Sequence, residues 1–207
     1  MKYLIIGILT VAVSTAALAQ ELDWPEHPLL TDEVKAELQE KQVAVAEKME
    51  SGKSGNAKAV VMGIVDAPPE TVWEELNDFE GQQEWTPKVE SAKIYTDNSD
   101  PDRSGVAFTT RVMLRTLAYH LMMRIDPEIM RVDYSLDEEK ENDFERIVGA
   151  WQAYPLAEGK SFVVHEIDIK TGIAIPQFLQ RFFMNKDLPD IVVSLKKRVE
   201  SGGTWTR

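Results

Sequence analysis

The central part of the chain alternates between apolar and polar residues with a period of two, as a β-strand with one buried face does. Between 104 and 115, for example, Val106, Phe108 and Val112 share one face while Arg111 and Arg115 share the other. The segments with this alternation are 104–115, 117–126, 130–136, 144–154 and 161–170. Polar turns separate them, and no connection is long enough for a crossover helix. The pattern predicts an antiparallel meander over residues 88–171.

Residues ahead of the meander predict a helix and a hairpin. Thr31 is a typical N-terminal cap with acidic residues directly after it, so a short helix is expected over 31–40. The alternating segments 42–50 and 58–65 flank the loop SGKSGN. This arrangement predicts a β-hairpin, whose first strand could otherwise be a continuation of the helix.

Apolar residues with helical spacing mark two further regions. A proline pair opens a helix near residue 69, with Trp73 on its apolar face, and Trp85 lies in a short helical turn after it. Beyond the meander, a helical region begins at Pro176 and restarts at Leu188 to continue to residue 201. The tail 202–207 is expected to fray, with Trp205 as its candidate anchor.

This order of elements is an α+β layout in which one long C-terminal helix must cover a strongly curved antiparallel sheet. A helix about 10 Å wide cannot fill the concavity of six or seven strands. The side chains that face the helix are large, apolar and aromatic. We therefore expect a hydrophobic cavity between the sheet and the C-terminal helix.

The first nineteen residues have the three parts of a secretory signal peptide. Lys2 supplies the positive charge, a short apolar stretch follows, and Ala17-Leu18-Ala19 is a small-residue cleavage site. The apolar stretch is shorter than the roughly 20 residues that span a bilayer, although an uncleaved N-terminal anchor is the alternative. We expect cleavage after Ala19 and a periplasmic or secreted protein. The predicted organisation is then signal peptide 1–19, N-terminal extension 20–56, ligand-binding domain 57–201 and tail 202–207.

Composition narrows the classes of function. The chain has 207 residues, 43% of them hydrophobic, and a net charge of −12 from 23 basic and 35 acidic residues. A negative field repels phosphate, so we expect no nucleic-acid partner. Absence of cysteine excludes disulfides, thiolate metal sites and cysteine nucleophiles. The acidic residues at positions 74, 75 and 78 are expected to form a solvated helix face.

Three sequence strings resemble the START-like superfamily, which includes the polyketide cyclase/dehydrase (SRPBCC) and coenzyme Q-binding groups. The strings are VDAPPETVW at 65–73, LNDFE at 76–80 and EWTPKVES at 84–91, supported by GAW at 149–151 and Ile175-Pro176. The resemblance covers about residues 58–200. It implies the helix-grip fold, and it carries over no catalytic residues because the superfamily has no invariant set. The additional N-terminal hairpin strand departs from the minimal pattern and is expected to plug or extend the sheet edge.

Strand parity and helical spacing select the side chains that would line the cavity. They are Phe108, Val112, Tyr119, Leu121, Met123, Tyr134, Ile147, Trp151, His165, Phe178 and Phe182. If these side chains contact one another they are core, and if they line a void they form the ligand site. His165 shares inward parity with Val163 and Ile167, where a hydrogen-bonded core histidine is the simpler interpretation. The three histidines have no metal-ligand spacing, so no metal or other cofactor is expected.

Two functions fit this pattern. The first is a protein that binds, or transfers, a hydrophobic small molecule such as a lipid, quinone or sterol-like ligand, with a transient membrane contact. The second is a cyclase/dehydrase-like enzyme in which Tyr119, Tyr134 or His165 moves protons. We favour binding, because the sequence contains no arrangement of catalytic residues. A filled core that serves only in protein interaction is a third alternative.

Overall fold

Eight antiparallel strands form one curved sheet in the computed structural model, which describes residues 22–51, 56–97, 99–112, 114–171 and 183–207. The strands are β1 (Val43–Ser51), β2 (Asn56–Val65), β3 (Val89–Ile94), β4 (Arg103–Val112), β5 (Arg115–Asp126), β6 (Arg131–Leu136), β7 (Arg146–Ala157) and β8 (Lys160–Lys170). Their order across the sheet is β1-β2-β8-β7-β6-β5-β4-β3. The predicted meander is confirmed as β3 to β8, and the predicted hairpin is confirmed as β1 and β2. Strand β1 extends the sheet edge.

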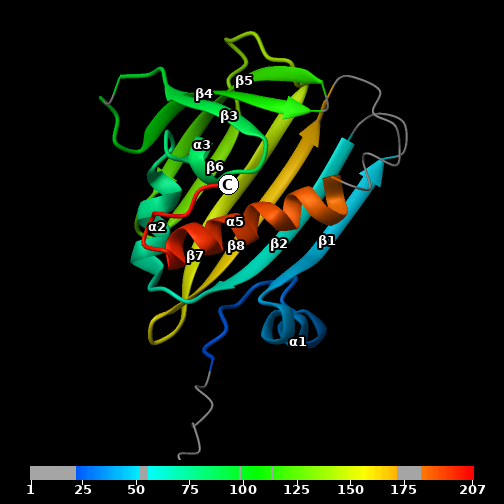
Figure 1. The fold of residues 1–207 in the computed structure, drawn as a ribbon, viewed down its shortest axis with the longest axis vertical. Coiled ribbons are helices and arrows are strands. Elements are labelled where there is room, and N and C mark those ends of the chain that lie inside the picture. Colours follow the sequence, from blue (N-terminus) through cyan, green and yellow to red (C-terminus); the bar gives the residue numbers. More distant parts are fainter. Residues whose placement is uncertain (1–21, 52–55, 98, 113, 172–182) are drawn as a thin grey trace, which may run out of the picture.

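The helices on the concave side of the sheet are α2 (Pro69–Asn77), α3 (Gln82–Trp85) and α5 (Leu188–Glu200), with the π-helical turn η1 (Phe183–Asp187) leading into α5. Helix α5 runs diagonally across the sheet (Figure 1) and packs on β2 and β1, whereas α2 packs on β7 and β8. This arrangement is the expected helix-grip fold. No helix among the described residues has the length and apolarity to cross a bilayer.

Helix α5 buries one apolar face against the sheet. Leu188, Val192 and Leu195 on this face are fully buried. The helix approaches β2 most closely at Gly63, where an added Cβ atom would lie 2.6 Å from Cγ1 of Val192. A side chain at position 63 would therefore push the helix away from the sheet. The expected helix from Pro176 lies outside the described residues.

The convex face of the sheet carries a second apolar core, which is covered by the N-terminal segment 22–41. This segment contains α1 (Asp32–Lys41), capped by Thr31 Oγ1, which accepts a hydrogen bond from the Val34 amide. Trp24 packs edge-on against Phe162 with ring centroids 5.8 Å apart. Even-numbered residues of β8 thus face this core, and odd-numbered residues face α5.

The C-terminal end of α5 is fixed by an ion-pair cluster in which Arg198 and Glu75 are largely buried and Glu84 is half exposed. Arg198 Nε lies 3.0 Å from Glu75 Oε1, and Arg198 Nη2 lies 2.9 Å from Glu84 Oε2. Glu75 therefore does not belong to a solvated face as expected, because Arg198 holds it between α2 and α5. The tail also docks: Arg198 Nη1 donates to the Trp205 carbonyl, and the Arg207 amide donates to the Glu84 carbonyl. The expected fraying is not seen, because the Trp205 carbonyl accepts from Arg198 of α5 and the Arg207 amide donates to Glu84 of α3.

Candidate ligand-binding site

The predicted lining residues within the described part of the chain lie on the concave side of the sheet. Those buried there are Phe108, Leu121, Met123, Tyr134, Ile147, Trp151 and His165, and those partly buried are Val112 and Tyr119. The parity assigned to these residues is confirmed. Phe178 and Phe182 lie outside the described residues. These residues form the apolar surface of the concave face, which contains two groups of packed aromatic side chains.

The first aromatic group holds the Tyr119 ring from two sides. The ring stacks on Phe108 with centroids 5.4 Å apart and meets Phe144 edge-on at 5.2 Å. Its hydroxyl makes no hydrogen bond to any described residue, and burial raises the pKa of Tyr119 well above its ordinary value. The hydroxyl is near enough to Tyr134 to raise the pKa of Tyr134 as well. Tyr119 thus presents an unpaired polar group to an apolar surface.

The second group joins three neighbouring strands. The His165 ring stacks on Trp151 at 3.9 Å, nearly parallel, and His165 Nε2 lies 2.8 Å from the Tyr134 hydroxyl. The same hydroxyl lies 3.2 Å from the Glu166 carbonyl oxygen, which can only accept. Both contacts are satisfied when Nε2–H donates to Tyr134 and Tyr134 donates to Glu166. Nδ1 of His165 is then an unprotonated acceptor, and it has no hydrogen-bond partner.

Burial determines the protonation of this second group. Desolvation lowers the pKa of His165 from 6.5 to about 3, and it also raises the pKa of Tyr134. Both residues are therefore uncharged at neutral pH. The expectation that His165 is a satisfied core histidine is correct for Nε2 only.

A glycine allows Tyr134 to reach across β7. Tyr134 is paired with Gly149, which is in turn paired with Ile167 of β8. An added Cβ atom at Gly149 would lie less than 3.0 Å from both the Tyr134 hydroxyl and the Glu166 carbonyl. Without a side chain at this position, the tyrosine passes over one strand and bonds to the next.

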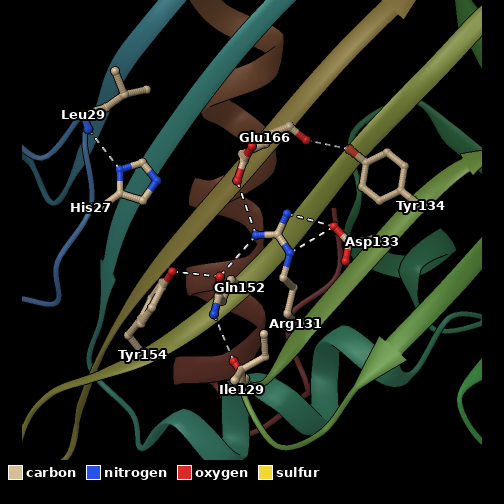
Figure 2. A network of polar contacts seen from close by, with 9 residues as sticks. All are labelled: His27, Leu29, Ile129, Arg131, Asp133, Tyr134, Gln152, Tyr154 and Glu166. Carbon is tan, nitrogen blue, oxygen red and sulfur yellow. Dashed lines mark hydrogen bonds and ion pairs between the residues drawn. The ribbon is translucent and has the colours of Figure 1, made fainter.

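The convex face behind this group carries the polar network shown in Figure 2. Arg131 donates to Asp133 at 2.9 Å, to Gln152 at 3.2 Å and to Glu166 at 3.4 Å, and so ties β6, β7 and β8 together. Gln152 also accepts from Tyr154 at 2.7 Å. Because Glu166 belongs to this network through its side chain and to Tyr134 through its carbonyl, the network fixes the backbone that orients Tyr134.

The described concave face has no buried ionised side chain between β4 and β8. Arg115, expected on the face opposite Val112, belongs to β5 and pairs with Val112, so it shares the concave face at the exposed end of the strand. The other residues that face inward on these strands are aliphatic, aromatic or neutral polar, and the neighbouring inward positions of β2 include the small Ala57 and Ala59. Arg131, Glu166 and the other charged residues of β6, β7 and β8 lie on the convex face. No group of three His, Asp or Glu side chains in the described ranges is arranged to hold a metal ion.

The inward side chains differ in how completely they are covered. Val61 and Val163, which face α5, and Val192 of α5 itself have no exposed surface. Trp151 and Tyr134 are each 7% exposed and Leu121 is 6% exposed, although all three are inward-facing strand residues. These three side chains of β5 to β7 are therefore not completely covered by the described residues.

A hollow of about 460 Å³ on the convex side has a different character. It is lined by Tyr95, Thr96, Arg103, Met122, Asp137, Glu139 and Lys140. The Tyr95 hydroxyl donates to Asp137 at 2.6 Å, and its ring meets His120 edge-on, so His120 is half-buried although strand parity places it on the face opposite Tyr119. Charges of both signs line this hollow, which makes it a poorer place for a hydrophobic ligand than the concave face.

One contributor to the concave face was missed from the sequence. Phe144 has the parity of an outward residue if a strand begins at 144, but β7 begins at Arg146 and Phe144 turns inward against Tyr119. Its signal was a large aromatic residue directly after a polar turn. Gly149 was recognised as part of a family string, without its role as the gap for Tyr134.

The geometry described so far defines a helix-grip protein with an apolar, uncharged concave face. Residues 65–196 match the family model described as polyketide cyclase / dehydrase and lipid transport, and the chain belongs to this family. No curated protein sequence matches the chain.

Solved structures share the fold at low sequence identity. The Zhui aromatase/cyclase of Streptomyces sp. R1128 is 18% identical with a TM-score of 0.59, covering 72% of this chain and 93% of that one. A START superfamily protein of Mycobacterium smegmatis is 17% identical with a TM-score of 0.60, covering 70% and 97%. A STAR-related lipid transfer protein of Xanthomonas axonopodis is 12% identical with a TM-score of 0.62, covering 77% and 94%.

Proposed function

We propose that the protein binds a hydrophobic small molecule between the concave face of the sheet and α5, either to store it or to transfer it. The observation that carries this proposal is the residual exposure of Trp151, Tyr134 and Leu121 on a face that is otherwise apolar. Burial of apolar ligand surface at about 25 cal/mol per Å² supplies affinity with few polar contacts. The family description, which includes lipid transport, supports the same function.

The protonation states favour binding over the cyclase/dehydrase alternative. A general base that works near neutral pH needs a pKa near that pH. His165 has a pKa of about 3, and burial moves the pKa values of Tyr119 and Tyr134 upward, away from neutrality. These groups are suited to donating and accepting hydrogen bonds, and they are poorly suited to abstracting a proton from a bound substrate.

The test is binding of the neutral fluorescent dye Nile red to a matched pair of variants. Val112→Trp adds bulk at a partly buried inward position, and Val148→Trp makes the same change at a position that is 41% exposed on the convex face. We expect Val112→Trp to weaken dye binding at least tenfold and Val148→Trp to leave it unchanged. A wild-type protein that binds no dye, or a Val148→Trp variant that loses binding equally, contradicts the proposal.

We further propose that the protein is exported after cleavage behind Ala19 and contacts a membrane transiently to exchange its ligand. Lys2, the short apolar stretch and the small-residue site Ala17-Leu18-Ala19 support this export. Leu114, at the turn between β4 and β5, is 96% exposed, and an apolar side chain at such a position is suited to the interface of a bilayer. Mass spectrometry of the native N-terminus tests export, since a chain that retains Met1 contradicts it. Co-sedimentation with uncharged phosphatidylcholine vesicles, compared with Leu114→Ser, tests the membrane contact, and equal sedimentation of the two proteins contradicts it.

A further inference from the structure

The Tyr119 hydroxyl is a polar group without a partner in an apolar surrounding. Phe108 and Phe144 fix its ring from the face and the edge, so the hydroxyl is held in one place. It bonds to no described residue, whereas the nearby Tyr134 hydroxyl is occupied by His165 and Glu166. Tyr119 is only partly buried, so its hydroxyl is open to a ligand oxygen, and a hydrogen bond to that oxygen would replace one made to water.

The surroundings of Tyr119 determine the charge of such a ligand. The buried and partly buried inward positions of β4 to β8 among the described residues carry no Lys or Arg that could neutralise an anion and no Asp or Glu that could neutralise a cation; Arg115, opposite Val112 at the end of β5, is exposed to solvent. The ionisable groups that face Tyr119 from neighbouring strands are Tyr134 and His165, and both are uncharged at neutral pH. An ion buried here would lose its hydration without a counter-charge.

We infer that the ligand is a neutral hydrophobic molecule with a hydroxyl or carbonyl oxygen, and that this oxygen hydrogen-bonds to the Tyr119 hydroxyl. A tyrosine hydroxyl both donates and accepts, so either oxygen group fits. Alcohols, phenols, quinones and esters belong to this class, whereas fatty-acid carboxylates and lipids with a buried phosphate do not. The inference rests on the proposed function and narrows its ligand class.

The experiment compares probes that share one alkyl chain and differ in the head group. Displacement of Nile red is measured with 1-dodecanol, methyl dodecanoate and dodecanoate at neutral pH, below the concentration at which each aggregates. It is repeated with Tyr119→Phe and with Tyr154→Phe, which removes a tyrosine hydroxyl from the convex network. Thermal unfolding of each variant checks that it is folded.

We expect the alcohol and the ester to bind at least tenfold more tightly than the carboxylate. Tyr119→Phe should weaken the alcohol by about three- to tenfold, the range expected for one net hydrogen bond, and Tyr154→Phe should leave it unchanged. Carboxylate binding equal to or tighter than alcohol binding, or an unaltered alcohol affinity in folded Tyr119→Phe, overturns the inference while the proposed function stands. Absence of Nile red binding overturns the proposed function itself.

Discussion

Replacement of His165 by glutamine should make the protein less sensitive to mild acid. His165 is 3% exposed and neutral, with its Nε2 bonded to Tyr134. In the unfolded chain the same imidazole takes up a proton at its ordinary pKa of 6.5, whereas in the folded chain the pKa is about 3. Glutamine keeps an amide donor for Tyr134 and cannot titrate.

The sign and size follow from the two pKa values. Because the folded pKa lies below the unfolded one, the unfolded state binds the proton first, and stability falls as the pH drops below about 6.5 and levels off near about 3. Between pH 7 and pH 5 the loss attributable to this one group is about 2 kcal/mol. His27 and the carboxyl groups are common to both proteins, so their contributions cancel in the difference between the two curves.

The assay is urea unfolding of the wild type and of His165→Gln at pH 7 and pH 5. The wild type should lose about 2 kcal/mol more than the variant over this interval. Equal losses in the two proteins would refute the burial of a neutral His165, as would an imidazole NMR signal that titrates near 6.5.

Two further substitutions test the supports of the site. Gly149→Ala places a methyl group against the Tyr134 hydroxyl and the Glu166 carbonyl, so it should lower the free energy of unfolding by about 1–3 kcal/mol in urea. The control Ala150→Gly, on the other face of the same strand, should lower the free energy of unfolding by less. A Gly149→Ala protein with unchanged stability contradicts the close crossing of Tyr134 over β7. Arg198→Met leaves Glu75 buried without its partner and should lower the unfolding free energy by about 3–5 kcal/mol. Adding Glu75→Gln to the Arg198→Met variant should recover part of this loss. Equal stability of the single variant and the double variant contradicts a buried pair.

The sequence was sufficient for the features that depend on strand parity. Val163, His165 and Ile167 alternate with residues of the convex core, and that alternation alone placed His165 inward. The same rule oriented Ile147 and Trp151 on the neighbouring strand. The hairpin of β1 and β2 was also predictable, because two alternating segments flank a glycine-containing loop.

Contacts between distant elements were not predictable from these patterns. The bond from Tyr134 to His165 spans β7 and requires the register of three strands together with the absence of a side chain at Gly149. The pair of Glu75 and Arg198 joins helices that are more than one hundred residues apart, so helical spacing indicates only a solvated acidic face. Parity also fails at strand ends, as Phe144 shows, because a residue outside the strand no longer follows the alternation.

Identification of the molecule that copurifies with the protein from its native host tests the central claim most directly. Native mass spectrometry followed by organic extraction should find about one neutral, oxygen-containing hydrophobic molecule per chain, and its occupancy should fall in Val112→Trp and persist in Val148→Trp. A protein that emerges empty and binds no Nile red would contradict ligand binding at the concave face.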